Sequence, residues 1–318
     1  MAISATLPPE IPLIAVAGPT ASGKSELAVV LAEALGGEVI NTDAMQVYRQ
    51  LDIGTAKPDA ALRDRVPHHL IDVVEPDEPY SAGHYVRDAG AIISRLHGQG
   101  RTAVLCGGTG LYFRALLQGI ATMPAIPEAV RERVTAALAR QGVAACHETL
   151  RQVDPETAAR VHPNDPSRVQ RALEVYYAAG RPLSAYHREQ PFGEVPPQVL
   201  MLGYAWERAV LYERINARVQ AMLDAGWIEE VRALLGRGYD PHLKPLRAIG
   251  YREIVALLRG ERDAAHLARD IAQRTRHYAK RQLTWFRRMP AMVWAPPEDT
   301  GALLARARDF LRQVQPPE

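Results

Sequence analysis

Short apolar runs alternate with helical patterns over the first 120 residues of the chain. The runs that resemble buried strands are Leu13–Ala17, Glu38–Ile40, His69–Val73 and Thr102–Cys106. Loops rich in Gly, Pro or Asp follow them, and Glu26–Leu35 and Ala82–Leu96 have the apolar spacing of helices. Strands that alternate with helices predict an α/β fold, with a parallel sheet core flanked by helices.

The strand pattern stops at about residue 122. Up to Arg188 the chain has only helical patterns interrupted by prolines, which predicts a mainly helical insertion domain over 122–194. A strand-like run returns at Gln198–Gly203, and the elements expected after it are helices at Glu207–Leu223, Ile228–Leu235, Ala248–Leu258 and Ala264–Arg288 and a strand at Met292–Trp294. The catalytic core is therefore expected to be discontinuous, over 1–121 and 195–318.

Composition places the chain among ordinary globular proteins. Of its 318 residues 47% are hydrophobic and 23% charged, and no apolar stretch approaches the ~20 residues of a membrane helix. The first residues lack the basic start of a secretory signal, and Cys106 and Cys146 stand far apart. We therefore expect reduced thiols, a cytoplasmic protein and no membrane partner.

Positive charge is concentrated near the C-terminal end, although the net charge is only +2. Residues 271–290 contain no Asp or Glu, and Tyr278, Trp285 and Phe286 stand among the basic residues Arg274, Arg276, Lys280, Arg281, Arg287 and Arg288. Basic and aromatic side chains together are typical of surfaces that bind phosphates and unstacked bases. A solvated helix face explains the pattern equally well.

The strongest motif is a G-x-x-x-x-G-K-S phosphate loop between the first strand and the first helix. Its residues are Gly18, Pro19, Thr20, Ala21, Ser22, Gly23, Lys24 and Ser25. Such a P-loop binds a di- or triphosphate through backbone N–H groups, a lysine ammonium and a hydroxyl that holds Mg²⁺, here Ser25. The motif predicts a bound phosphate chain but does not identify ATP.

Nucleotide hydrolysis also needs a carboxylate on a neighbouring strand. The only candidate is Asp72, after Leu70-Ile71, and its short run favours a structural role. The phosphate loop is therefore expected to serve a reaction other than hydrolysis.

Two further segments follow strands of the predicted sheet. Asp43 comes after the second strand, with Ala44, Met45 and Gln46, and Thr109 comes after the fourth. Carboxyl ends of parallel strands share one edge of a sheet, so these residues are expected beside the phosphate loop. Asp43 is a candidate general base and Gln46 a candidate reader of a base edge, although Asp43 could instead cap a helix.

Six runs in sequence resemble the tRNA dimethylallyltransferase family. They are Gly18–Ser25, Asp43 through Asp52–Pro58, Gly107–Tyr112, Ser167–Glu174, Arg247–Arg252 and Lys280–Arg287. The resemblance implies transfer of a dimethylallyl group from dimethylallyl diphosphate, with Mg²⁺, to N6 of the adenosine 3′ of the anticodon. It also implies a tRNA anticodon stem-loop as partner, for which a monomer suffices.

The resemblance assigns roles to residues of this chain. Asp43, Lys24 and Thr109 would be catalytic. Arg214 and Arg218, an i,i+4 pair on one helix face, could close over the diphosphate beside the phosphate loop, although an ordinary surface pair explains them equally well. The tRNA contacts would be Asp43, Ala44, Met45, Gln46, Thr109, Arg131, Ser167, Arg168, Val169, Gln170, Arg171, Arg247, Ala248, Ile249, Gly250, Tyr251, Arg252, Lys280, Arg281, Gln282, Leu283, Thr284, Trp285, Phe286 and Arg287. Taken without the resemblance, the arginines among them fit ordinary solvated helix faces equally well.

Two other enzyme classes remain open at this point. A P-loop small-molecule or nucleotide kinase would use the same loop for ATP. An adenylate dimethylallyltransferase would share Asp43 and the loop but would have little use for the long basic helix. An RNA-binding module without catalysis is disfavoured, because it would not need Lys24 opposite Asp43.

Overall fold

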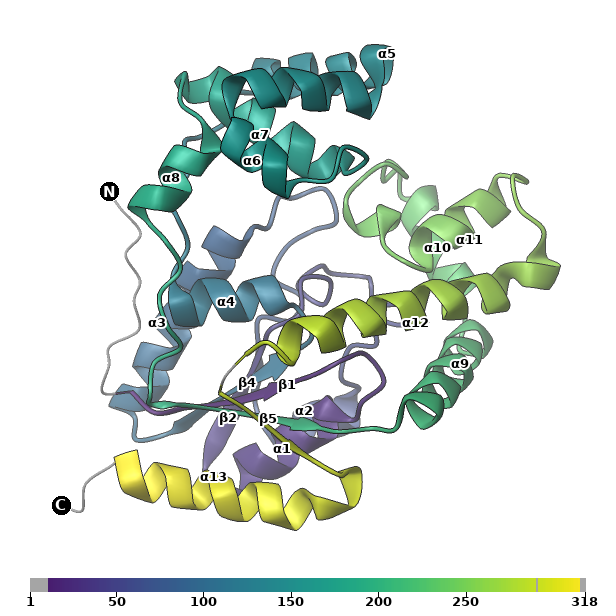
Figure 1. Cartoon of the computed structure of the whole chain (residues 1–318). Helices are drawn as coiled ribbons and strands as arrows, with labels where there is room; N and C mark the ends of the chain where they lie inside the picture. Colours follow the sequence, from purple (N-terminus) through teal and green to yellow (C-terminus); the bar gives the residue numbers. More distant parts are fainter. Residues whose placement is uncertain (1–10, 290, 315–318) are drawn as a thin grey trace. The chain divides into compact units, whose positions relative to one another are not determined.

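The protein's structure, a computed structural model, describes residues 11–289 and 291–314 (Figure 1). The chain divides into two compact units. The larger contains the described residues up to Gln118 and from Glu194 onward, and the smaller is Gly119–Gly193. The sequence placed the insertion at 122–194.

A six-stranded parallel sheet forms the centre of the larger unit (Figure 1). Its order is β3-β2-β4-β1-β5-β6, with bounds β1 Leu13–Ala17, β2 Gly37–Asn41, β3 His68–His69, β4 Thr102–Gly107, β5 Val199–Tyr204 and β6 Met292–Ala295. All residues of β1, β2 and β5 are buried, as apolar runs in a sheet covered on both faces should be. The predicted α/β class is confirmed.

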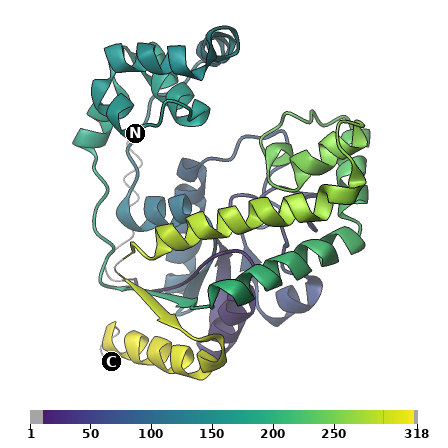
Figure 2. The ribbon, with the colours of Figure 1, turned by 45° about the vertical axis from the view of Figure 1, so that its right-hand side comes forward.

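Helices cover both faces of this sheet. The bounds are α1 Lys24–Ala34, α2 Ala60–Arg65, α3 Ala82–Gly98, α4 Gly110–Gln118, α9 Arg208–Asp224, α10 Trp227–Gly236, α11 Tyr251–Leu258, α12 Leu267–Phe286 and α13 Thr300–Val314. Helices α1 and α13 pack with the strands in one apolar core, while α3 packs against the opposite face. Figure 2 shows α9 and α12 running side by side.

The smaller unit is helical throughout its regular structure. It contains α5 Glu128–Val153, interrupted at Gly142, and then α6 Pro155–Arg160, α7 Pro166–Ala179 and α8 Leu183–Glu189. Two of the prolines in this segment, Pro155 and Pro166, stand at the first turn of α6 and α7, where the missing N–H costs nothing. Leu150, Val169 and Leu173 belong to its own apolar core.

The structure corrects one predicted strand. The run expected at His69–Val73 forms only β3, because Leu70 and Asp72 adopt left-handed backbone conformations with φ of 60° and 56° that turn the chain out of the sheet. Helices α2, α4 and α13 were not expected from the hydrophobic pattern. None of the described helices combines the length and apolar character needed to cross a membrane.

Candidate active site at the carboxyl edge of the sheet

The phosphate loop connects β1 to α1, as the motif predicted. Two residues of the loop are left-handed, Ala21 with φ 63° and Gly23 with φ 86°, and Gly23 precedes the first turn of α1. The amides of this first turn have no helical partner, and the helix dipole places positive potential there. The geometry at the end of β1 is therefore suited to an anion.

Lys24 is the cation of this site. Its Nζ donates a hydrogen bond to the carbonyl of Pro19 at 3.3 Å. Burial lowers the pKa of Lys24, and the nearby Arg218 lowers it further, whereas Cys106 and Asp43 act in the opposite direction. A dianion bound here would compensate the cost of keeping this ammonium charged.

Asp43 lies one strand away, just beyond β2. Its Oδ1 accepts a hydrogen bond from the amide of Met45 at 2.9 Å, and its own amide donates to Oδ1 of Asn41 at 3.1 Å. The following residues form turns and no α-helix begins there, so the alternative that Asp43 caps a helix is wrong. The carboxylate instead forms an Asx turn.

Thr109 joins the Asp43 turn to the loop after β4. Its Oγ1 accepts a hydrogen bond from the amide of Ala44 at 2.9 Å. Because the oxygen is the acceptor in this bond, the hydroxyl hydrogen remains available for another partner. Glycine is required two residues before Thr109, since a Cβ on Gly107 would lie 2.1 Å from the carbonyl oxygen of Thr42.

Gln282 of α12 connects the phosphate loop to the loop after β4. Its Oε1 accepts from the amide of Thr20 at 2.9 Å, and its Nε2 donates to the carbonyl of Gly108 at 2.9 Å. The side chain is buried, so its polar atoms are used inside the protein. Gln282 also lines the cavity described next, and its expected tRNA contact stays a prediction.

Residues of the phosphate loop, the Asp43 turn and the loop after β4 line one cavity of about 470 Å³. Lys24, Ser25, Asp43, Gln46 and Thr109 form its polar side, and its apolar walls include Ile215, Val219, Met222, Trp227 and Ile249. A neighbouring cavity of about 530 Å³ shares Lys24 and Ser25 and is lined by Arg214 and Arg218. One apolar chamber thus meets a positively charged one at the phosphate loop.

The two arginines of α9 lie beside the phosphate loop, as expected. Nε of Arg214 donates to the carbonyl of Ala21 at 3.0 Å, and its guanidinium lies over the ring of Trp206. Burial lowers the pKa of Arg218, while Asp43 opposes this shift. Both cations border the chamber that would receive phosphate oxygens.

Trp227, the first residue of α10, forms a wall of the cavity that no sequence motif predicted. A Cβ on Gly54 or Gly250 would lie about 2 Å from its indole, so these glycines make room for the ring. Glu230 holds the same region, because its carboxylate accepts from the amides of Asp52 at 2.8 Å and Ile53 at 2.7 Å and from the hydroxyl of Tyr251 at 2.7 Å.

Comparisons with known proteins show the family to which the chain belongs. The IPP transferase family model matches residues 46–289, and the isopentenyl transferase model matches residues 11–66. A relative described as tRNA dimethylallyltransferase, from Geobacter sulfurreducens, is 51% identical over 89% of this chain and 91% of its own length. The chain belongs to the tRNA dimethylallyltransferase family. The resemblance drawn from the sequence motifs is confirmed.

Solved structures of the family share the fold. The tRNA isopentenylpyrophosphate transferase of Bacillus halodurans is 37% identical, with a TM-score of 0.70 over 96% of this chain and 98% of that one. A eukaryotic dimethylallyltransferase described as acting on tRNA is 27% identical, with a TM-score of 0.79 over 96% of this chain and 81% of that one.

The RNA-contact residues expected from the family motifs fall into three groups in the larger unit. Ala44, Met45, Gln46, Arg247, Ala248, Ile249 and Arg281 line the 470 Å³ cavity. Lys280, Thr284, Arg287 and Arg252 are exposed, and Leu283 and Trp285 are partly buried. Phe286 is fully buried, so its side chain supports this surface from inside, which corrects the expectation that it faces the RNA. Tyr251 is almost fully buried but lines the cavity, so its expected RNA contact stays a prediction.

The corresponding residues of the smaller unit lie on α5 and α7. Arg131, Ser167, Arg168 and Arg171 are exposed, whereas Val169 is fully buried in the core of that unit. Val169 is therefore a packing residue, contrary to its expected RNA contact. Arg131 pairs with Glu128 on its own helix, and Arg168 pairs with Asp165, the residue that caps α7. Gln170 donates to Glu174 at 2.8 Å.

Proposed function

We propose that this tRNA dimethylallyltransferase family member transfers the dimethylallyl group of dimethylallyl diphosphate to N6 of the adenosine 3′ of the anticodon, with release of diphosphate. The observation that carries the proposal is the cavity in which Lys24, on the phosphate loop, and Asp43, after β2, face one apolar chamber. A diphosphate leaving group, a prenyl chain and a proton acceptor would all find their partners there.

The leaving group would be held by the phosphate loop. Negative charge grows on the diphosphate as the allylic C–O bond breaks, and the amides at the start of α1, Lys24 and Arg218 would stabilise it. The hydroxyl of Thr109 has its hydrogen free to donate to the bridging oxygen.

The prenyl chain would occupy the apolar part of the chamber. Ile215, Val219 and Met222 come from one face of α9, and Trp227 begins α10. Apolar walls exclude water, which would otherwise capture the allylic carbon as it becomes cationic. The adenine would have to leave the base stack of the anticodon loop to reach this chamber.

Asp43 would act on the nucleophile. The lone pair of the adenine amino nitrogen is delocalised into the ring, so removal of its proton as the new C–N bond forms accelerates attack by about 10²–10⁴. One carboxylate oxygen of Asp43 accepts from the amide of Met45, and this hydrogen bond fixes the orientation of the group. The proton lost by N6 would pass to the carboxylate.

Mg²⁺ fits the oxygen atoms at the phosphate loop. The described residues contain no group of three acidic, His or Cys side chains placed to hold a metal, but Ser25 and Asp43 line the same cavity. Mg²⁺ commonly takes few protein ligands and keeps waters and phosphate oxygens. When bound, it would neutralise charge on the diphosphate.

The RNA itself would contact the exposed basic side chains. In the larger unit these include Lys280, Arg281 and Arg287 of the segment at α12, and in the helical unit Arg131, Arg168 and Arg171. The anticodon arm is recognised in this proposal through phosphates and splayed bases. We further propose a cytoplasmic, monomeric enzyme.

The kinase alternative lacks a carboxylate where it needs one. The strands on either side of β1 are β4 and β5, and neither contains Asp or Glu. Asp72, the only candidate, pairs with Lys57 at 2.5 Å and with Arg63 at 3.5 Å. The adenylate transferase alternative does not account for the exposed basic residues of α12.

The direct test incubates the protein with labelled dimethylallyl diphosphate, Mg²⁺ and total tRNA, and analyses the nucleosides. We expect label in N6-dimethylallyladenosine, with AMP a very poor acceptor. Efficient prenylation of AMP, or phosphate transfer from ATP to a small molecule, would overturn the proposal.

A further inference from the structure

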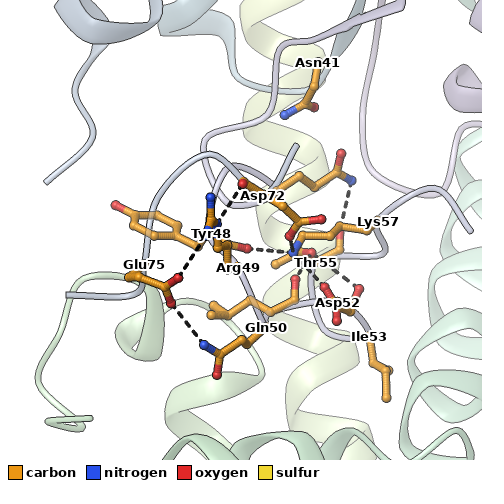
Figure 3. Close-up of polar contacts among 12 residues, drawn as sticks. Asn41, Tyr48, Arg49, Gln50, Asp52, Ile53, Thr55, Lys57, Asp72 and Glu75 are labelled. Carbon is orange, nitrogen blue, oxygen red and sulfur yellow. Dashed lines mark hydrogen bonds and ion pairs between the residues drawn. The ribbon is translucent and has the colours of Figure 1, made fainter. Parts of the chain in front are cut away.

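Lys57 has a side chain that is only 3% exposed, in a motif that the proposed chemistry does not use. Its ammonium donates to the carbonyl of Tyr48 at 2.6 Å, to Oδ1 of Asp52 at 2.7 Å and to Oδ1 of Asp72 at 2.5 Å. Figure 3 shows these contacts around Lys57. We refer to Tyr48, Asp52, Lys57 and Asp72 as the Lys57 network.

The network uses all the donors that Lys57 has. An ammonium carries three hydrogens, and three acceptors surround this one. Two of them are carboxylates, so the positive charge is also compensated. Lys57 is therefore not a phosphate ligand, although it lines the cavity that Lys24, Arg214 and Arg218 share.

The network joins backbone segments that are individually strained. Gln50, Ala56, Leu70 and Asp72 have φ between 51° and 65°, in the left-handed region that side chains other than glycine rarely adopt. Such residues cost about 1–3 kcal/mol each and persist where the surroundings hold them. The bond from Lys57 to Asp72 ties the segment containing Ala56 to the one containing Leu70.

The carbonyls fixed in this way meet the side chain of Gln46. Its Nε2 donates to the carbonyl of Thr55 at 3.1 Å and to that of Ala56 at 3.0 Å, which uses both amide hydrogens. A flipped amide would place Oε1 against two carbonyl oxygens, so the orientation is determined. Gln46 lines the cavity that contains Asp43, and Oε1 has none of the hydrogen bonds found among the described residues.

We propose that Lys57 is a positioning residue that selects the base through Gln46. By fixing the carbonyls of Thr55 and Ala56, the Lys57 network holds the Gln46 amide so that it offers the cavity a hydrogen-bond acceptor and no donor. This inference rests on the proposed function, since it concerns the adenosine in that cavity.

An acceptor at this position matches an amino group and repels a carbonyl. Adenine carries N6–H₂, whose hydrogens can be donated, whereas guanine carries O6, which can only accept. Glutamine usually reads adenine with both its amide nitrogen and its oxygen, but here the nitrogen is already bound. Sites built to bond an NH group discriminate strongly against analogues without it.

The test compares Lys57→Met, Gln46→Ala and the double variant with a synthetic anticodon stem-loop as acceptor. Misplacing a reacting group by about 1 Å costs about 10²-fold, so each single variant should lose about that factor in kcat for the RNA. If Lys57 acts through Gln46, the double variant should be no slower than the slower single variant. The KM for dimethylallyl diphosphate should stay within twofold of wild type.

Unreactive stem-loops provide a readout that loss of stability would not change. One stem-loop carries guanosine at the reacting position and the other carries unsubstituted purine riboside, and both serve as competitive inhibitors. Wild type should bind the stem-loop with purine riboside at least tenfold more tightly than the stem-loop with guanosine. Lys57→Met should remove most of this difference in affinity. Asp72→Asn keeps the shape of the side chain and should reduce the same affinity difference by a smaller amount. This variant replaces Lys57→Met in the test if Lys57→Met does not fold.

Arg101→Met is the matched control. Arg101 pairs with Glu38, a buried carboxylate near the start of β2. Asp43 follows the opposite end of β2, so this variant breaks an ion pair of that strand away from the site. It should lower the melting temperature but leave the inhibitor ratio unchanged. Losses that multiply in the double variant, a raised donor KM, or an unchanged inhibitor ratio in folded Lys57→Met or Asp72→Asn would overturn the inference. Absence of prenylation by the wild type would instead refute the proposed function, and this inference with it.

Discussion

Thr109 holds Ala44 by a 2.9 Å hydrogen bond from the Ala44 amide to Oγ1, so the loop after β4 fixes the residue that follows Asp43. The two strands are neighbours in the sheet, with Asn41 of β2 opposite Cys106 of β4. Sheet register and this hydroxyl thus help to position Asp43, the proposed proton acceptor. In the proposed reaction the same hydroxyl serves the leaving group, which couples the two halves of the chemistry.

Lys24→Ala should impair the departure of diphosphate. The ammonium lies at the phosphate loop, where negative charge grows as the bond breaks, so turnover should fall by about 10²–10³. Steady-state kinetics at saturating donor and Mg²⁺ measure this loss, and filter binding should show unchanged tRNA affinity.

Lys244→Ala is the matched control for Lys24→Ala. Lys244 is exposed, and its Nζ donates to the carbonyl of Tyr80 at 3.2 Å, outside both cavities. Turnover of this variant should remain within twofold of wild type. Near-normal turnover of Lys24→Ala itself would remove the phosphate loop from the mechanism.

Asp43→Asn should separate proton transfer from binding. Asparagine keeps the size of the side chain and its oxygen can still accept from the Met45 amide, but it cannot take a proton. We expect kcat to fall by about 10²–10⁴ with tRNA affinity little changed. Single-turnover rates and tRNA binding, measured on the same preparation, give the two quantities.

The opposite result for Asp43→Asn would assign Asp43 a role other than proton acceptor. Strongly weakened tRNA binding with kcat maintained would make Asp43 a contact residue, and a large drop in melting temperature would make it chiefly a structural support of its turn. Asn41→Ala is an informative comparison, because it removes the acceptor of the Asp43 amide without touching the carboxylate.

Local sequence signals predicted the parts of the site that are contiguous in the chain. The phosphate loop and the Asp43 segment each follow a buried strand, and the parallel sheet brings them together. Gln282 and Glu230 were not predictable in their roles, because each contacts backbone about 170 or more residues away. The sequence pattern also could not show that Phe286 is buried against Phe113 while the next residue, Arg287, is exposed.

Asp154→Asn should destabilise the helical unit in a pH-dependent way. Asp154 is 1% exposed and accepts from the amide and hydroxyl of Thr157 and from the amide of Ser184. Burial raises the pKa of Asp154, but these hydrogen bonds more than offset it and hold the pKa below its ordinary value. The loss at pH 7 should be about 1–3 kcal/mol.

The sign of the pH effect follows from the depressed pKa. The folded state favours the carboxylate, so its stabilisation is complete above the unfolded pKa of about 3.9 and disappears as pH falls through the lower folded value. The difference in urea midpoint between wild type and Asp154→Asn should therefore shrink below about pH 4. A difference that grew in acid would contradict this account.

Charge removal on α12 should change the salt dependence of tRNA binding. Lys280 and Arg287 are exposed at the end of α12 that carries Gln282, and we expect them to contact phosphates. Replacing both by Gln should raise KM for tRNA and flatten the log–log salt slope by about 0.7–0.9 for each phosphate that the variant no longer neutralises. The KM for dimethylallyl diphosphate should not change.

Arg306→Gln with Arg308→Gln removes the same charge from another surface and is the matched control. Both arginines are exposed on α13, which packs with α1 on the face of the sheet opposite α3. If only total charge mattered, the two double variants would flatten the slope equally. If only the α12 variant has a flatter salt slope, the phosphates contact α12, because the slope reflects counterions released where basic side chains neutralise phosphates. Equal slopes in wild type and the α12 variant would remove Lys280 and Arg287 from the RNA-binding surface.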